Sequence, residues 1–435
     1  MVARFSFWAM KRRSVLLVLA FVVALGETSA APVSAHAANP NVVITWNGIM
    51  MATFATAVVP PPAAIRLGAI VQASVFDAVN GIDPQYTAVH VAPAGPAGAS
   101  RQAAAAAAAH TALVSLFPLQ QSALDAQFAS SLAAMRGDEG ASSRIAAGIA
   151  WGNSVAGQTL AWRAADGFST VLPYTQGSAP GDWAPTPGGS GPPKFQSLSI
   201  TVPFAMTSPS EFRPAGPPAL TSARYTADFK EVKAYGSATS AVRSTFQTET
   251  ATFWQADTPV GIWDRVADSL AMANHLNLLR SARLLAMVNL AEADAIIAVF
   301  DAKAHFNSWR PVTAVAGAAL DGNPDTTTEA GWTPLLTTPY FQEYPSAHSG
   351  VSTAATVVLS SFFGNQASFT VTSAGLPGVV RNFRSFSAAV EQVADARIYA
   401  GFHFRFSTED ATQMGTRIGR LTDSTLMQRI RDEEE

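Results

Sequence analysis

Residues 281–309 read SARLLAMVNLAEADAIIAVFDAKAHFNSW, and this stretch decides the fold class of the chain. Its apolar residues recur at helical spacing, which predicts one long helix. Pro311 disfavours helical geometry at the residue before it, so we expect the helix to stop at Arg310. Charged residues within the run exclude a membrane span: Glu292, Asp294, Asp301 and Lys303.

Helical patterns also fill most of the chain on both sides of this stretch. The expected helices cover residues 63–81, 101–116, 120–135, 143–165, 225–234, 239–254, 264–279, 347–363, 387–400 and 408–430. Strand signals are sparse, and the best is FTVT at 369–372. The sequence therefore predicts an all-α fold built as a helical bundle. The letters VFDA recur at 75–78 and 299–302, late in two apolar helices, so two related bundles are one hypothesis and coincidence is the other.

The composition narrows the function classes. The chain has 435 residues, of which 48% are hydrophobic and 14% charged, and this balance is typical of a globular protein with a large core. A net charge of −3 gives no basic surface for a nucleic acid. The absence of cysteine excludes disulfides, thiolate ligands and thiol nucleophiles.

Residues 1–37 have the pattern of a signal peptide. Three basic residues at 11–13 precede an apolar run at 15–25, and AHA at 35–37 forms an A-x-A cleavage site. We expect cleavage after this site, with Ala30 as the alternative, and export to the periplasm or the extracellular space. An arginine pair in the basic segment also fits a twin-arginine signal. The apolar run is too short to span a bilayer, so no membrane span is expected in the mature chain.

The rest of the chain divides at a stretch rich in proline and glycine. Residues 38–166 form an N-terminal helical part, and residues 223–435 form a C-terminal helical part. Residues 167–222 between them form a long loop, in which seven prolines and glycines lie between positions 185 and 193. A long loop in a compact protein is often a functional lid over the site, and a simple connector between the two helical parts is the alternative.

Two cations lie near the end of the long helix. Lys303 and Arg310 are seven residues apart, close to two helical turns, so both side chains would leave from one helix face. A solvated basic face would explain such a pair. The apolar neighbours favour a pocket: Phe300, Ala302, Phe306 and Trp309.

A second motif, YPSAHSG at residues 344–350, precedes an apolar helix. Ser346 stands at the N-cap position, where unpaired backbone N–H groups and the helix dipole favour a bound anion. His348 would lie in the first turn, close to that anion. A capped helix with an incidental histidine is the alternative. Glu343, just before the motif, is expected at the surface, and a place in the wall of the pocket is the alternative.

A third motif, RIYAGFH, covers residues 397–403. Gly401 is a natural helix terminator, which places Arg397 in the last turn of a helix and His403 just past its end. A salt bridge within its own helix would also explain Arg397, and His403 would then be an ordinary core histidine. Together, the three motifs offer three cations, a helix N-terminus and two histidines to one anion.

The ordered set of motifs resembles the signature of the vanadium-dependent haloperoxidase and phosphatidic acid phosphatase type 2 superfamily. The matching patterns are Lys303-x6-Arg310-Pro311, Pro345-Ser346-Ala347-His348 and Arg397-x5-His403, which together span about 100 residues. Aromatic residues and prolines before the second motif also resemble the soluble bacterial haloperoxidase-like branch: Trp332, Pro334, Pro339, Phe341 and Tyr344.

The resemblance implies a role for each residue. Lys303, Arg310 and Arg397 would neutralise the oxygens of a bound vanadate, or of phosphate in the same site. The hydroxyl of Ser346 and the backbone N–H of Ala347 would donate hydrogen bonds to the same anion. In a haloperoxidase, His403 would bind vanadium and His348 would be the acid–base group. In a phosphatase, His403 would be the nucleophile and His348 would protonate the leaving alcohol.

Two positions depart from the superfamily pattern. Ala347 replaces the usual glycine, and it still offers a backbone N–H although its methyl group would crowd an anion on that side. Ser407 occupies the position of the aspartate that usually orients the imidazole of His403. The nearest acidic residues are Glu409 and Asp410, which are candidates for that role.

Three functions are compatible with these residues. The leading hypothesis is an exported vanadium-dependent haloperoxidase that oxidises a halide with hydrogen peroxide. The first alternative is a soluble acid phosphatase of the same superfamily, which would act on a phosphate ester through a phosphohistidine. The second alternative is a non-catalytic oxyanion-binding protein. All three imply small-molecule partners and no nucleic acid, and a homo-oligomer is compatible with each.

Overall fold

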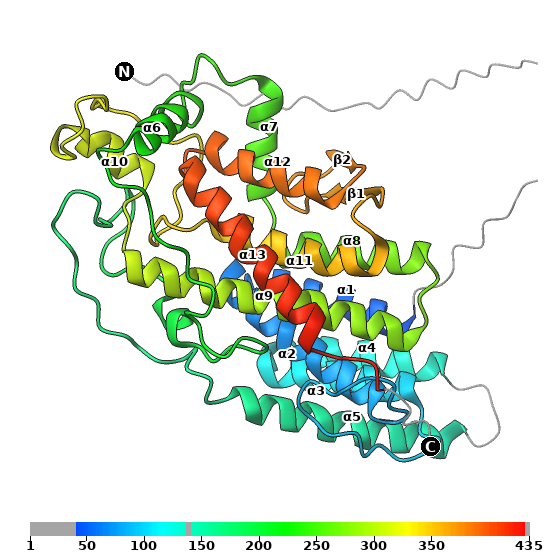
Figure 1. The fold of residues 1–435 in the computed structure, drawn as a ribbon. Helices are drawn as coiled ribbons and strands as arrows, with labels where there is room; N and C mark the ends of the chain where they lie inside the picture. Colours follow the sequence, from blue (N-terminus) through cyan, green and yellow to red (C-terminus); the bar gives the residue numbers. More distant parts are fainter. Residues whose placement is uncertain (1–40, 136–140, 431–435) are drawn as a thin grey trace, which may run out of the picture. The chain divides into compact units, whose positions relative to one another are not determined.

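Residues 41–135 and 141–430 are described by a computed structural model. Within these residues the chain forms thirteen α-helices, three short 3-10 helices and one two-stranded antiparallel sheet (Figure 1). The prediction of an all-α helical bundle is therefore confirmed. The expected signal peptide at residues 1–37, with its cleavage site, lies outside the described residues.

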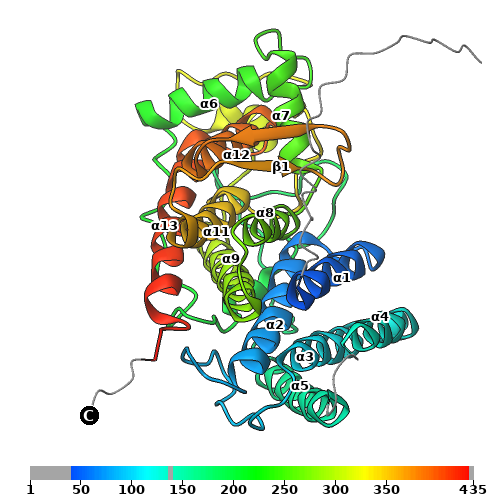
Figure 2. The same ribbon diagram turned by 90° about the vertical axis from the view of Figure 1, so that its right-hand side faces the viewer.

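The first five helices form one packed group. They are α1 (Val42–Thr56), α2 (Pro61–Asn80), α3 (Arg101–Leu116), α4 (Gln121–Ala134) and α5 (Ala141–Arg163), with η1 (Pro118–Gln120) before α4. α2 packs against α3 and α5, which also pack against each other (Figure 2). α2 is long and apolar enough to cross a membrane, but 89% of its apolar window is buried inside the protein. A buried core helix has the same composition.

The remaining helices are arranged around α9 (Leu278–Phe306). They are α6 (Ala223–Tyr235), α7 (Thr245–Gln255), α8 (Pro259–Ala273), α10 (Pro311–Gly317), η3 (Ala318–Leu320), α11 (Ala347–Phe363), α12 (Phe386–Tyr399) and α13 (Arg405–Thr425), with β1 (Phe369–Thr372) and β2 (Val380–Phe383) before α12. α9 packs against α2, α8, α11 and α13. The sets α2–α3–α5 and α9–α11–α13 thus share one pattern, in which a long helix contacts two later helices that also contact each other. Two related bundles would have this arrangement.

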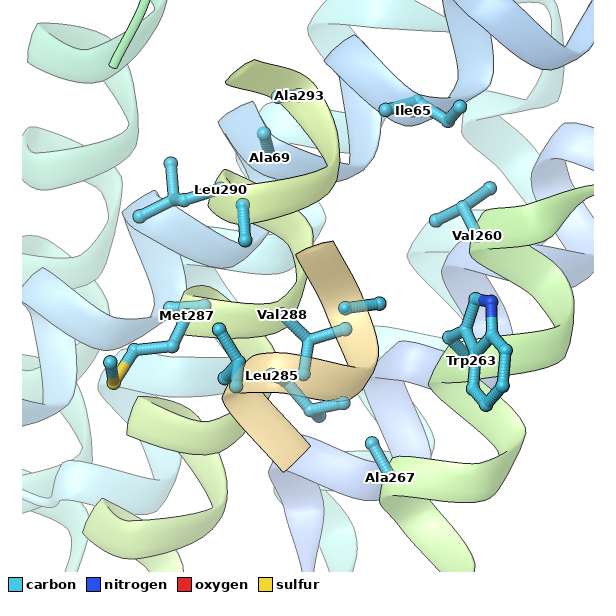
Figure 3. Packing of buried hydrophobic residues seen from close by; sticks show 14 of the residues in the cluster. Ile65, Ala69, Val260, Trp263, Ala267, Leu285, Met287, Val288, Leu290 and Ala293 are labelled. Carbon is cyan, nitrogen blue, oxygen red and sulfur yellow. The ribbon is translucent and has the colours of Figure 1, made fainter. Parts of the chain in front are cut away.

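The contacts of α9 with α2 and α8 lie at the centre of the hydrophobic core. Figure 3 shows the side chains that meet there: Ile65 and Ala69 of α2, Val260, Trp263 and Ala267 of α8, and Leu285, Met287, Val288, Leu290 and Ala293 of α9. The helices approach closely, since a Cβ on Gly68 would lie 2.4 Å from Asn289 Oδ1. Burial of each large aliphatic side chain contributes about 1.5–3 kcal/mol, so this core holds α9 and its last turn in place.

The structure corrects the predicted end of the long helix. α9 ends at Phe306 because Asn307 adopts the left-handed conformation (φ 47°), which asparagine tolerates better than most residues. Arg310 then occupies the N-cap of α10, so Pro311 begins a helix and does not end one. Lys303 and Arg310 therefore leave from two different helices, and not from one helix face as their spacing predicted.

Most other expected helices overlap the observed ones, and the expected strand is β1. Three elements were not predicted: α1, α10 and β2. The segment of α1 begins with VVIT, whose β-branched side chains weaken a helix signal. Burial of one face stabilises α1 in spite of this signal, and the face includes Val43, Trp46, Met50 and Phe54. β2 has only four residues, and it pairs with β1 so that Phe383 lies opposite Phe369.

The Pro/Gly-rich loop at 167–222 links α5 to α6 and contains η2 (Gln196–Ile200). It is tied to α9 at two points. Asp294 accepts hydrogen bonds from the backbone N–H groups of residues 204–206 at 2.6 to 3.0 Å. Asp301 forms a bidentate pair with Arg213, with both contacts at 2.7 Å. The loop is therefore packed along α9, the helix that carries Lys303.

Two carboxyl groups are buried between α8 and α9. Asp264 and Glu292 are both 0% exposed. Asn289 Nδ2 donates to Asp264 Oδ1 at 2.7 Å, whereas neither oxygen of Glu292 has a hydrogen-bond partner within the described residues. Burial and then repulsion from Asp268 raise the pKa of Asp264 well above its ordinary value, and burial and then repulsion from Asp264 do the same to the pKa of Glu292. Folding therefore favours the protonated form of Glu292.

Glu292→Gln should stabilise the protein by an amount that grows with pH. Above the unfolded-state pKa of about 4.3, Glu292 takes up a proton when the protein folds. The free energy of unfolding therefore falls as the pH rises, by up to about 1.4 kcal/mol per pH unit, until the pH reaches the raised pKa of the folded state. Glutamine removes this dependence. Urea unfolding at about pH 5 and about pH 8 measures the difference, with the exposed Glu391→Gln as the control. An equal gain at both pH values would contradict a protonated Glu292.

Candidate oxyanion site

Three buried cations lie together at the ends of three helices. Lys303 is in the last turn of α9, Arg310 is at the N-cap of α10, and Arg397 is in the last turn of α12. None of the three is more than 1% exposed. A buried charge is costly unless it is paired, so this cluster favours a negatively charged partner.

The guanidinium groups of Arg310 and Arg397 each have one buried nitrogen without a partner among the described residues. Arg310 donates from Nε to Phe341 O at 2.8 Å and from Nη1 to Phe402 O at 3.0 Å. Arg397 donates from Nη1 to Gln255 Oε1 at 2.9 Å. Arg310 Nη2 and Arg397 Nε are buried and have no partner among the residues that the structure describes. These two donors are called the open N–H groups below.

Lys303 is held by the backbone of the segment before α11. Its Nζ donates to Gln342 O at 2.8 Å and to Glu343 O at 2.7 Å, and an ammonium group has a third hydrogen to donate. The ring of Phe341 lies beside two of the cations, with its centroid 5.4 Å from Lys303 Nζ and 5.0 Å from Arg310 Cζ. The aromatic face stabilises this positive charge on one side of the site.

The electrostatics of the site show how strongly it favours an anion. Burial and the charge of Arg310 lower the pKa of Lys303 well below its ordinary value. Burial lowers the pKa of Arg310 to about 10. Burial and the charge of Arg310 lower the pKa of Arg397 to about 9. A bound anion would offset both the desolvation and the repulsion, and it would raise all three pKa values.

His403 lies between these cations and a buried carboxylate. Its Nδ1 is 2.7 Å from Glu343 Oε1, which also accepts the backbone N–H of Phe404 at 3.2 Å. Because Oε1 acts as an acceptor, Nδ1 carries the hydrogen and Nε2 keeps its lone pair. Nε2 is 3.1 Å from Arg310 Nη1. His403 therefore presents a basic nitrogen beside the cations.

Burial and the neighbouring cations favour the uncharged form of the imidazole. Burial and the positive charges of Arg310, Lys303 and Arg397 lower the pKa of His403 well below its ordinary value. Burial raises the pKa of Glu343 to about 7, against the opposing effect of Lys303 and Arg310. A neutral imidazole is the form that ligates a metal or attacks an electrophile.

The position of Glu343 corrects the expectation that it lies at the surface. It is 0% exposed, and its backbone N–H donates to Ser308 O at 3.0 Å. It performs the orienting contact that the superfamily pattern assigns to the position of Ser407, whose Oγ is 3.4 Å from His403 Nδ1. The signal in the sequence was its place three residues before Ser346, within the segment that must reach the site.

The two acidic candidates on α13 do not contact His403. Glu409 pairs with Arg224 at 2.7 Å near the surface. Asp410 accepts a hydrogen bond from Tyr344 Oη at 2.7 Å. Both carboxylates have other partners, so neither substitutes for the missing aspartate.

The N-terminus of α11 faces the same site. Ser346 is its N-cap, as predicted, and Ser349 Oγ donates to Ser346 Oγ at 3.0 Å, so the hydroxyl hydrogen of Ser346 stays available. The backbone N–H of Ser346 donates to Ser407 O at 3.1 Å, which ties α11 to the chain beside His403. The backbone N–H of Ala347 has no partner among the described residues, as expected in a first helical turn. Its methyl group packs against the main hydrophobic cluster.

His348 lies in the first turn of α11 at the edge of the site. It is half-buried, and it lines a cavity of about 270 Å³. Burial and the charges of Arg397, Arg310 and Lys303 lower its pKa well below the ordinary value. A bound anion would raise that pKa again, so His348 would gain the ability to exchange a proton near neutral pH only when the site is filled.

The structure thus brings together all seven residues that the three motifs singled out. They are Lys303, Arg310, Ser346, Ala347, His348, Arg397 and His403, and Glu343 joins them. Within the described ranges no cluster of three or more histidine or carboxylate side chains could hold a metal cation. The donor set is cationic and hydrogen-bonding, which suits a tetrahedral oxyanion and one imidazole ligand.

Comparisons with known proteins concern the fold as a whole. Residues 283–432 match a family model described as the VCPO second helical-bundle domain. The structure is similar to that of a bacterial vanadium-dependent iodoperoxidase, with a TM-score of 0.78 and 25% identity over 91% of this chain and 98% of that chain. A search of curated protein sequences finds no match.

The fold is also similar to that of a bacterial vanadium-dependent chloroperoxidase. Its holo form gives a TM-score of 0.67 at 17% identity, over 84% of this chain and 91% of that chain. Its apo form gives a TM-score of 0.69 at 18% identity, over 84% of this chain and 92% of that chain. These likenesses and the family model confirm the predicted resemblance to the vanadium-dependent haloperoxidase superfamily.

Glu343→Gln should weaken the binding of orthovanadate by about 10- to 100-fold, because the amide no longer holds Nδ1–H of His403 with a charge. Glu409→Gln should leave the affinity unchanged, since Glu409 pairs with Arg224. Isothermal titration calorimetry with orthovanadate measures both variants. An orthovanadate affinity in Glu343→Gln equal to that of the natural protein would show that this carboxylate does not orient the imidazole of His403.

Proposed function

We propose that this chain is a vanadium-dependent haloperoxidase that oxidises a halide with hydrogen peroxide. The observation that carries the proposal is the buried group of three cations around His403, whose Nδ1 is held by Glu343. The similarity to a vanadium-dependent iodoperoxidase at 25% identity supports it. The balanced reaction takes hydrogen peroxide, a halide ion and one proton to hypohalous acid and water.

The residues present fit vanadate as the cofactor. The open N–H groups of Arg310 and Arg397 are buried donors that the described protein does not satisfy, and a vanadate oxygen supplies the acceptor. The third ammonium hydrogen of Lys303 adds a donor. Nε2 of His403 would ligate vanadium, since its lone pair is directed toward the cations.

Two further groups would complete the hydrogen bonds to the anion. They are the hydroxyl of Ser346 and the backbone N–H of Ala347, at the positive end of α11. The methyl group of Ala347 packs against apolar side chains, so the replacement of the usual glycine leaves the N–H in place. Phosphate has the same shape and charge distribution, and it would occupy the same donors.

The chain contributes electrostatic stabilisation and proton transfer. Vanadate, when bound, supplies a Lewis-acidic centre that activates hydrogen peroxide toward a halide. The three cations stabilise negative charge on the oxygens without reorganisation, because packing already holds them in place. His348, at the edge of the site, would take a proton from the peroxide and return one to the leaving oxygen. The burial of the three cations and of His403 limits the access of water to the site.

One observation favours a phosphatase as the second candidate. The sequence weakened this hypothesis because the orienting aspartate was missing, and Glu343 now makes that contact with His403. A carboxylate on Nδ1 also increases the nucleophilicity of Nε2, which phosphohistidine chemistry needs. The two functions therefore differ in the group that occupies the site and not in the residues around it.

Vanadate-dependent oxidation of iodide or bromide should be observed with the purified protein. One portion, stripped of vanadium and reloaded with orthovanadate, is given hydrogen peroxide and each halide, and the oxidised halogen is measured. A second, vanadate-free portion is given p-nitrophenyl phosphate. Halide oxidation only after reloading supports the haloperoxidase. Phosphate release that vanadate inhibits, without halide oxidation, would make the protein a phosphatase, and neither activity would make it an oxyanion-binding protein.

His348→Ala should spare orthovanadate binding and reduce halide oxidation by about 10²- to 10⁴-fold, the usual contribution of an acid–base group. Arg397→Ala should abolish orthovanadate binding, because it removes one charge and one open N–H group. Calorimetry measures binding, and circular dichroism checks the helical content. The exposed His305→Ala is the matched control. Loss of binding in His348→Ala would instead identify His348 as a ligand.

We also propose that the mature chain acts outside the cytoplasm. The basic, apolar and A-x-A segments within residues 1–37 support this location. Mass spectrometry of the exported protein would find a new N-terminus after Ala37, whereas an intact Met1 would contradict the proposal.

A further inference from the structure

A mostly apolar cavity of about 270 Å³ opens in front of His348. Its walls come from elements that are far apart in the sequence. Ile65 of α2, Ile296 of α9 and Val351 of α11 contribute aliphatic surface. Figure 3 shows Ile65 on α2, within the hydrophobic core that α2 forms with α8 and α9. The cavity thus joins the oxyanion site to the N-terminal helices.

Phe195 forms an aromatic wall of the cavity from the Pro/Gly-rich loop. Its ring centroid lies 6.2 Å from Phe300 and 6.5 Å from Phe341, at interplanar angles of 84° and 69°. Phe341 itself borders Lys303 and Arg310, as described above. The same ring therefore separates the cationic site on one side from the apolar cavity on the other.

The backbone of Phe195 is held in an unfavourable conformation. Its φ of 60° and ψ of 27° lie in the left-handed region, which a bulky side chain adopts only when its surroundings require it. Lys194 N–H donates to Tyr340 O, and Tyr340 Oη donates to Gly191 O, each at 2.9 Å. These bonds clamp the loop onto the segment before α11. The conformation places the ring of Phe195 in the cavity wall, beside His348.

Four polar side chains interrupt the apolar walls, and two of them are the hydroxyl-bearing Thr337 and Thr338. The other two are His348 and Gln255. Gln255 Oε1 accepts a hydrogen bond from Arg397 Nη1. The amide nitrogen of Gln255 has no partner among the described residues, so its two hydrogens remain available to a ligand. Pockets for drug-sized ligands measure roughly 300–1,000 Å³, so this cavity suits a smaller molecule. Mostly apolar walls with one imidazole, one amide and two hydroxyl groups suit an aromatic ring that bears one hydroxyl.

We propose that this cavity binds a one-ring phenol as the halogen acceptor, with Phe195 as a residue that determines its specificity. The inference rests on the proposed function for the source of the halogen. Phe195 and Phe341 would contact the ring, and His348 and Gln255 would hold the hydroxyl. The Pro/Gly-rich loop then acts as a lid and not only as a connector.

The transfer balances without a further reagent. Hypohalous acid, formed at the oxyanion site, would meet the bound ring before it diffuses away. A ring carbon forms the bond to the halogen as the oxygen–halogen bond breaks, and the ring proton joins the released hydroxide to give water. Because the hydroxyl is held at one end of the cavity, one ring position faces the oxyanion site. The halogen would then enter that position preferentially.

The first test measures binding of o-cresol to the vanadate-free protein by calorimetry. We expect one saturable site, and Phe195→Ala should weaken the affinity about threefold to tenfold, the usual effect of losing one aromatic contact. The matched control is Phe212→Ala, a half-buried phenylalanine of the same loop that packs over Arg417 away from the cavity. Absence of saturable binding, or equal loss in both variants, would overturn the acceptor site.

The second test uses the natural protein and depends on no variant. The loaded enzyme, with hydrogen peroxide and bromide, is given o-cresol, and the ratio of ortho to para products is compared with that from hypobromous acid alone. A ratio that differs by about threefold or more, and that returns toward the reagent value in Phe195→Ala, supports transfer in the cavity. The reagent ratio with normal bromide oxidation would overturn it. Failure to oxidise bromide would count against the proposed function, and the calorimetry would still decide whether the cavity binds a phenol.

Discussion

The burial of three like charges around one point is the constraint on which the rest of the site depends. Lys303, Arg310 and Arg397 would repel one another into solvent unless the surrounding structure held them. The apolar contacts of α9 with α2 and α8 fix the last turn that carries Lys303. Backbone carbonyls at 341–343 and at Phe402 then accept some of the hydrogen bonds that Lys303 and Arg310 can donate. What the described protein leaves unsatisfied matches the oxygens of a tetrahedral anion.

The carboxylate of Glu343 extends the same logic to the imidazole. The chemistry needs an acceptor at Nδ1 of His403, so that Nε2 faces the cations with its lone pair. It does not need that acceptor to come from any particular place in the sequence. Here it comes from the segment before α11, and Ser407 stands where the superfamily pattern has an aspartate. A search confined to that position therefore misses the residue that makes the contact.

The structure separates two chemical environments with a single ring. On one side of Phe341 lie charged groups that stabilise an oxyanion, and on the other lies an apolar cavity. His348 belongs to both, because it stands at the start of α11 where they meet. In the proposed reaction, this arrangement would limit the access of water to the charged groups, and it would give the oxidised halogen an organic neighbour. The Pro/Gly-rich loop contributes to it through Phe195.

The sequence by itself determined the helical class, the order of the three motifs and the N-cap at Ser346, because these depend on local spacing and on short-range hydrogen bonds. It also identified all seven motif residues that the structure brings together. Only the tertiary structure decided that Glu343 is buried, and that Lys303 and Arg310 come from two helices. Pairing between distant segments is not encoded in local periodicity, and Asn307 ends α9 through a backbone conformation that packing selects. The cavity wall at Phe195 has the same origin, since loop packing alone holds a phenylalanine in the left-handed region.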